Sequence, residues 1–97
     1  MISFDNIIGF EWDEGNARKN EKHGVSQTEA EQVFLNAPLL ILEDIAHSGK
    51  EQIFHTLGVT DEGRKLHVTV TIRGSCLRVI SARDMHKKER NIYETQS

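Results

Sequence analysis

Three arginines in the second half of the chain are suited to binding a phosphodiester. Arg73 ends a segment that alternates apolar and polar residues, and Arg78 and Arg83 lie in the segment that follows it. A guanidinium stays charged at any working pH and offers a planar fork to phosphate oxygens. If the second segment is a regular strand, Arg78 and Arg83 point to opposite faces, because they are five residues apart.

Groups that can move a proton occur in or next to the predicted loops. RNA is cleaved when a 2′-hydroxyl attacks the neighbouring phosphorus, which requires an oriented backbone, proton transfer and positive charge at the transition state, but no metal. His23, His47 and Glu51 are the candidates for proton transfer. His23 precedes Gly24, and it can equally satisfy the last carbonyls of a helix.

Other chemistries lack their usual sequence patterns. The five histidines include no pair at the close spacing of metal sites, and the single cysteine, Cys76, excludes a CxxC motif and an internal disulfide. The chain has no GxSxG motif, Walker motif or glycine-rich phosphate loop. We therefore expect no metal and no cofactor, and Cys76 is interpreted as a small packed residue or an edge residue rather than a nucleophile.

Composition predicts one soluble domain over residues 1–97, in the cytoplasm and without a membrane span, because no apolar run approaches the ~18 residues that a span needs. The net charge of −3 conceals an asymmetry. Residues 1–62 hold four basic and twelve acidic side chains, whereas residues 63–97 hold eight basic and three acidic. Such asymmetry indicates one surface for a polyanion and another for a different partner, or else an ordinary solvated C-terminal helix.

Periodicity and capping patterns predict the elements that carry these residues. Ser26 and Glu29 match a capping box at the start of a helix, and residues 65–73 alternate with period two, with His67 on the polar face in contact with solvent or a partner. We expect strands over 7–12, 39–42, 52–59, 65–73 and 77–83, and helices over 13–22, 27–36 and 84–95. This order predicts an α+β domain: a largely antiparallel β-meander with two N-terminal helices and a C-terminal helix.

Motifs along almost the whole chain resemble the BrnT family, the ribonuclease toxins of type II toxin–antitoxin modules. The resembling segments are Phe10-Glu11-Trp12-Asp13, Lys22-His23-Gly24-Val25-Ser26, His47-Ser48, Gly63-Arg64, Arg73-Gly74, Arg78-Val79-Ile80-Ser81-Ala82-Arg83-Asp84-Met85 and Lys87-Lys88-Glu89-Arg90. The resemblance implies a RelE-like fold and a metal-independent endoribonuclease that inhibits translation. It also implies a BrnA-like antitoxin, which neutralises the toxin and contacts operator DNA for the complex.

By analogy with RelE-like enzymes, the resemblance implies roles for individual residues. Arg83 and Arg73 would bind phosphate and stabilise transition-state charge, and His47 or Glu51 would transfer the proton. RNA would be positioned by Lys22, His23 and Arg78.

Two features depart from the family pattern. One residue instead of two separates Asn20 from Lys22, and Ile53 stands where the family usually has arginine. The alternative function is therefore an antitoxin-binding module with weak or no nuclease activity, which acts as a co-repressor.

Overall fold

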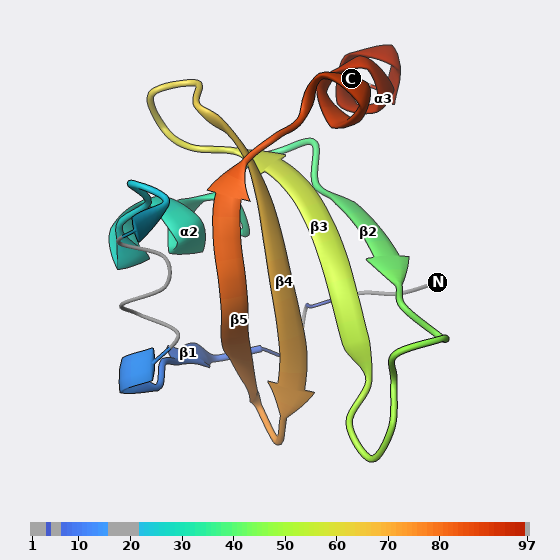
Figure 1. Ribbon diagram of the computed structural model, residues 1–97. Helices are drawn as coiled ribbons and strands as arrows, with labels where there is room; N and C mark the ends of the chain where they lie inside the picture. Colours follow the sequence, from blue (N-terminus) through green and yellow to red (C-terminus); the bar gives the residue numbers. More distant parts are fainter. Residues whose placement is uncertain (1–3, 5–6, 16–21, 97) are drawn as a thin grey trace.

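The computed structural model describes residues 4, 7–15 and 22–96, and within them five strands form one sheet (Figure 1). The elements are β1 (Gly9–Glu11), α2 (Gln27–Gln32), β2 (Leu40–Glu43), β3 (Ile53–Val59), β4 (Lys65–Arg73), β5 (Cys76–Asp84) and α3 (Lys87–Gln96). The sheet order is β1-β5-β4-β3-β2. Strands β2 to β5 pair antiparallel in chain order, whereas β1 pairs parallel with β5. The predicted α+β class and antiparallel meander are confirmed.

Several predicted boundaries move. Strand β4 matches the prediction, but the strand expected over 7–12 is shorter, and the helix expected over 84–95 begins at Lys87 because β5 continues to Asp84. Helix α2 begins with the predicted capping box, but it ends at Gln32. The next residues form turns with hydrogen bonds between residues three apart, from Phe34 N to Glu31 O and from Leu35 N to Gln32 O. Most of the helix expected over 13–22 lies outside the described residues, so it is not confirmed.

One face of the sheet forms the hydrophobic core with α2 and the segments beside it. Ala30 and Val33 from this layer are fully buried against the sheet. The core residues that the sheet contributes are Phe54, Leu66, Val68, Val70, Leu77, Val79 and Ala82. Val33, which follows α2, lies very close to Gly58 on β3, where an added Cβ atom would be 2.9 Å from Val33 Cβ. Gly58 therefore allows the end of α2 to pack directly on β3.

A β-bulge in β5 decides where the arginines point. Thr69 pairs with Ser81 and Val70 pairs with Val79, so Ile80 is an extra residue on β5. Arg78 pairs with Thr71 and Arg83 pairs with His67. Since directly paired residues share a face and the partners on β4 are four residues apart, both arginines lie on the face opposite the core. The prediction that they point to opposite faces is wrong, because it assumed a strand without a bulge.

We call this second surface the polar face; it carries His55, His67, Thr69, Thr71, Arg78 and Arg83. Helix α3 lies at the end of the sheet where β5 finishes (Figure 1). Tyr93 fastens α3 to the chain before β2, because its hydroxyl donates to Pro38 O at 2.6 Å. Within the described residues, no helix is long and apolar enough to cross a membrane.

Candidate functional site

Arg83 is held at the end of the polar face by a two-pronged ion pair with Glu89 from α3. Its Nη1 and Nη2 donate to Glu89 Oε1 and Oε2 at 2.8 and 3.0 Å, and Nη1 also donates to Asp84 O. The guanidinium lowers the pKa of Glu89 to about 2. Because 30% of the Arg83 side chain remains exposed, this cation is both oriented and accessible.

Asp44 binds His47 and His55 at the other side of the polar face, and we call these three residues the Asp44 cluster. Asp44 Oδ2 lies 2.7 Å from His55 Nε2 and 3.0 Å from His47 Nδ1. These hydrogen bonds lower the pKa of Asp44 to about 2, so the carboxylate is ionised and accepts from an N–H of each ring. The second nitrogen of His55, Nδ1, lies 2.9 Å from the Thr69 hydroxyl. Because the Asp44 carboxylate binds Nδ1–H of His47, Nε2 is the basic nitrogen of the neutral ring, and the side chain is 77% exposed.

His67 connects these two groups across the polar face. Its ring lies 5.2 Å from that of His55, centroid to centroid, and its Nε2 is 3.9 Å from Glu89 Oε2, beyond hydrogen-bond distance. Among the described residues, no partner binds His67 Nδ1. Burial, together with the charge of Arg83, lowers the pKa of His67 to about 4, so the ring is neutral at pH 7.

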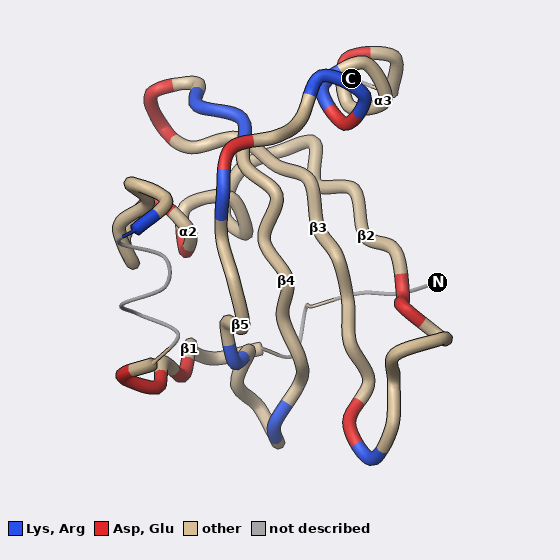
Figure 2. Tube along the Cα trace, viewed as in Figure 1, with Lys and Arg blue, Asp and Glu red and all other residues tan. Residues whose placement is uncertain are grey.

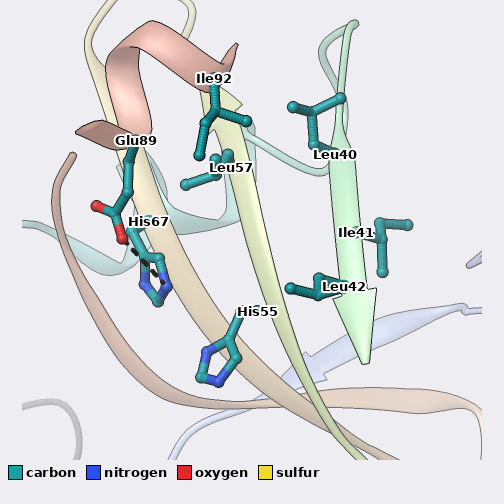
Figure 3. A pocket seen from close by; sticks show the side chains of 8 residues that line it. All are labelled: Leu40, Ile41, Leu42, His55, Leu57, His67, Glu89 and Ile92. Carbon is teal, nitrogen blue, oxygen red and sulfur yellow. Dashed lines mark ion pairs between the residues drawn. The ribbon is translucent and has the colours of Figure 1, made fainter. Parts of the chain in front are cut away.

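An apolar pocket of about 410 Å³ opens between β2, β3 and α3 (Figure 3). Its lining residues are Leu40, Ile41, Leu42, His55, Leu57, His67, Glu89 and Ile92. In the close-up, the imidazoles of His55 and His67 stand on one side of the pocket and the β2 leucines on the other. The pocket therefore lies between the Asp44 cluster and the Arg83–Glu89 pair.

The other two arginines have partners elsewhere on the sheet. Arg78 Nη2 donates to Asp13 Oδ2 at 2.7 Å, and Arg73 Nη2 donates to Glu51 Oε1 at 3.0 Å. Figure 2 shows basic segments at both ends of the β4–β5 hairpin. Arg73 lies six residues along β4 from His67, the partner of Arg83, which corresponds to about 20 Å. The structure therefore does not bring Arg73 and Arg83 to one phosphate.

Lys22 and His23 are exposed and precede Gly24, which is linked to the end of β5 by hydrogen bonds. Arg64 makes this connection: its Nη1 donates to Gly24 O at 2.8 Å, and its Nε and Nη2 donate to Asp84. Both residues therefore stand near the end of the sheet that carries Arg83.

Sequence reasoning missed His55 and underrated His67. Both lie on strands, whereas the predicted proton-transfer groups lie in or next to loops. The alternation of residues 65–73 placed His67 on the polar face, but only the pairing of β3 with β4 brings His55 beside it. The spacing of Leu77, Val79 and Ala82, two residues and then three, was the available signal for the bulge.

Within the described part of the chain, no group of three or more His, Cys, Asp or Glu residues is arranged to hold a metal ion. The carboxylates nearest the arginines are Asp13, Glu51 and Glu89, and each binds a guanidinium. The polar face thus offers cations, imidazoles and hydroxyls, and the carboxylates beside it bind guanidinium or imidazole groups.

Comparisons with known proteins bear on the fold and the family of the chain. The crystal structure of the Brucella abortus ribonuclease toxin, BrnT, has the same fold, with a TM-score of 0.61 and 23% sequence identity over 82% of this chain and 99% of that chain. A search of curated proteins finds no significant match. The family model for the ribonuclease toxin BrnT of type II toxin–antitoxin systems matches residues 12–89. The chain therefore belongs to the BrnT family of ribonuclease toxins.

Proposed function

We propose that this protein is a metal-independent endoribonuclease that cleaves RNA on the polar face of its sheet and thereby inhibits translation in the cytoplasm. The observation that carries the proposal is the β5 bulge, which puts Arg78 and Arg83 on the face that also holds the histidines. The reaction is attack of a ribose 2′-hydroxyl on the adjacent phosphorus. It leaves a 2′,3′-cyclic phosphate and a free 5′-hydroxyl.

Arg83 contacts the scissile phosphate and stabilises the negative charge of the transition state. Glu89 fixes its guanidinium in advance through two hydrogen bonds, so that little reorganisation is needed when charge develops. A guanidinium has five N–H donors, and the bonds to Glu89 and Asp84 O use only part of them. Arg83 can therefore bind a phosphate oxygen without releasing Glu89.

His47 accepts the proton from the 2′-hydroxyl, a solvent water protonates the departing 5′-oxygen, and His47 then releases its proton to solvent. Asp44 holds its Nδ1–H and thereby favours the tautomer in which Nε2 is basic, as a carboxylate orients a catalytic histidine in hydrolases. Glu51, the other candidate, is a weaker base, because its hydrogen bond with Arg73 lowers its pKa. Proton transfer therefore belongs to the Asp44 cluster.

The remaining basic residues position the RNA strand. Arg78 lies about 13 Å from Arg83 along the sheet, since their partners on β4 are four residues apart, so it contacts a different phosphate of the same strand. Arg73, which binds Glu51, contacts the RNA strand nearer the turn between β4 and β5. Lys22 and His23 bind RNA at the opposite end, near Asp84. These contacts affect substrate affinity more than the chemical step.

Membership in a type II toxin–antitoxin family implies an antitoxin protein as partner. We propose that the antitoxin is BrnA-like and that the complex reaches operator DNA through it. Of the twelve acidic side chains over residues 1–62, Asp13, Asp44 and Glu51 bind residues of the proposed catalytic surface, and the others supply negative charge that fits a basic antitoxin segment. A RelE-like mode of action is consistent with this division of the molecule into a catalytic and a docking surface.

The test is cleavage of a labelled RNA by purified protein in excess EDTA. Wild-type protein is expected to cleave it, and Arg83→Ala is expected to lose about 100-fold or more in kcat, as when one transition-state donor is removed. Arg90→Ala is the matched control, because Arg90, on α3, donates to Met85 O and has no place in the proposed site. Folding of each variant is checked by circular dichroism.

Two results would refute the proposal. Cleavage that requires added Mg²⁺ would exclude the metal-free mechanism. A folded wild-type protein that binds antitoxin and operator but cleaves no RNA would instead favour the co-repressor module, in which Arg83–Glu89 is purely structural.

A further inference from the structure

The pocket between β2, β3 and α3 has the composition of a site for a flat, mostly apolar group. Its volume of about 410 Å³ falls in the range of small-molecule sites, roughly 300–1,000 Å³. Leu40, Leu42, Leu57 and Ile92 supply aliphatic walls, and His55 and His67 supply two aromatic rings (Figure 3). Nucleobases stack on rings of this kind.

The hydrogen bonding of His67 points to a polar occupant rather than an aliphatic one. Its Nε2 stands 3.9 Å from the pocket-lining Glu89, beyond hydrogen-bond distance, and is the nitrogen that a ligand can reach, because Nδ1 is fully buried, without a partner in the described residues. A polar group left unsatisfied in a protein interior costs free energy unless a ligand or water completes it. The edge of a nucleobase carries donors and acceptors that can bind a neutral imidazole, whereas an inserted leucine or phenylalanine side chain carries none.

The neighbours of the pocket fit the rest of a nucleotide. Glu89 lines the pocket and also binds the Arg83 guanidinium at 2.8 and 3.0 Å. The accessible guanidinium of Arg83 therefore lies next to the pocket, directly beyond Glu89. On the other side, His55 shares Asp44 with His47. A base seated in the pocket would therefore have the Arg83–Glu89 pair on one side and the Asp44 cluster on the other, with its ribose and phosphate at the pocket mouth within reach of both.

We infer that this pocket is a nucleobase subsite, in which the base next to the scissile phosphate packs between the β2 leucines and the imidazoles of His55 and His67. The inference rests on the proposed ribonuclease function and adds to it the element that recognises the substrate. The base is held by stacking and by His67, so the pocket selects the cleavage position along the RNA. Arg83 and the Asp44 cluster then act on the phosphodiester beside it.

Binding is tested without turnover by titrating the protein with each of the four ribonucleoside 3′-monophosphates while recording methyl NMR spectra. Saturable shifts are expected at Leu42, Leu57 and Ile92 for at least one nucleotide. Ribose 5-phosphate is the control ligand, because it offers a phosphate to Arg83 but no base, and it is expected to leave these methyls unchanged.

Leu42→Asp tests the pocket wall, and we expect the variant to fold, since Leu42 is 70% exposed and the new carboxylate would stay in contact with water. We expect it to weaken nucleotide binding and to raise the KM for RNA about tenfold, as expected for the loss of one stacked base. Leu35→Asp is the matched control, because Leu35 is 79% exposed and lies outside the pocket. It is expected to bind and cleave like the wild type.

Three outcomes would overturn the inference. Equal shifts with ribose 5-phosphate, or none with any nucleotide, would show that no base enters the pocket. If Leu42→Asp weakens antitoxin binding while nucleotide binding and KM stay unchanged, the pocket receives an antitoxin side chain instead. Failure of the proposed function is a separate result, namely absence of RNA cleavage by wild-type protein, and it is read in a different assay.

Discussion

Burial of His67 should make the stability of this protein depend on pH between pH 7 and pH 5. The folded-state pKa of His67 is about 4, below the ordinary value of 6.5 that it regains on unfolding. In this window the unfolded chain binds a proton that the folded chain does not. The contribution of His67 to the free energy of unfolding is therefore fully present above pH 6.5, and it is lost as the pH decreases towards 4.

The magnitude follows from the two pKa values. The full shift corresponds to about 3 kcal/mol, since each pKa unit is equivalent to 1.36 kcal/mol. About 2 kcal/mol of this is lost between pH 7 and pH 5 by proton linkage. Asp44 and Glu89 also have lowered pKa values, but their stabilisation is lost mainly below pH 5, when unfolded carboxylates become protonated.

The assay is urea unfolding at pH 7 and pH 5, followed by circular dichroism, for wild type and His67→Phe. Phenylalanine keeps a ring beside His55 but has no titrating group, so the variant is expected to lose about 2 kcal/mol less than wild type over this interval. His86→Gln is the control, because the His86 side chain is exposed in the fold. Identical pH dependence in wild type and His67→Phe would refute the reasoning.

Three further predictions concern packing and the site. Gly58→Ala puts a methyl 2.9 Å from Val33 Cβ and should lower the free energy of unfolding by about 1–3 kcal/mol. Gly49→Ala is its control, because the new methyl meets no atom within 4 Å and should change this free energy by less than about 0.5 kcal/mol. Urea titration measures both changes. Asp44→Asn should reduce kcat about tenfold or more with little change in KM, and an unchanged kcat in steady-state RNA cleavage would exclude the Asp44 cluster from proton transfer. Arg73→Ala should raise KM with kcat within about threefold of wild type, because Arg73 is far from Arg83; a loss of kcat equal to that of Arg83→Ala would contradict this assignment.

The elements with strong local patterns could be predicted from the sequence. The alternation over residues 65–73 located β4, and the Ser26–Glu29 capping box located the start of α2. The bounds of α2 and α3 were less accurate, because the chain after Gln32 continues in turns and β5 extends to Asp84. Local propensity does not specify where tertiary pairing ends a helix or extends a strand.

The site was harder to predict than the fold, since its members meet only through strand pairing. Arg83 and His67 are sixteen residues apart in sequence and become partners across β4 and β5. His55 joins them through β3, and one extra residue in β5 decides the face of Arg78. The arginines themselves were selected correctly as strand residues, but their common face depends on the register.

The chemistry of the RNA ends made by the wild-type protein tests the central claim most directly. An oligoribonucleotide is cleaved in EDTA, and the fragments are analysed by mass spectrometry. Attack by the 2′-hydroxyl, with Arg83 at the phosphate, predicts a 2′,3′-cyclic phosphate on one fragment, and no cleavage when the ribose at that position is replaced by 2′-deoxyribose. A 3′-hydroxyl end, or cleavage of the deoxy-substituted strand, would contradict the account.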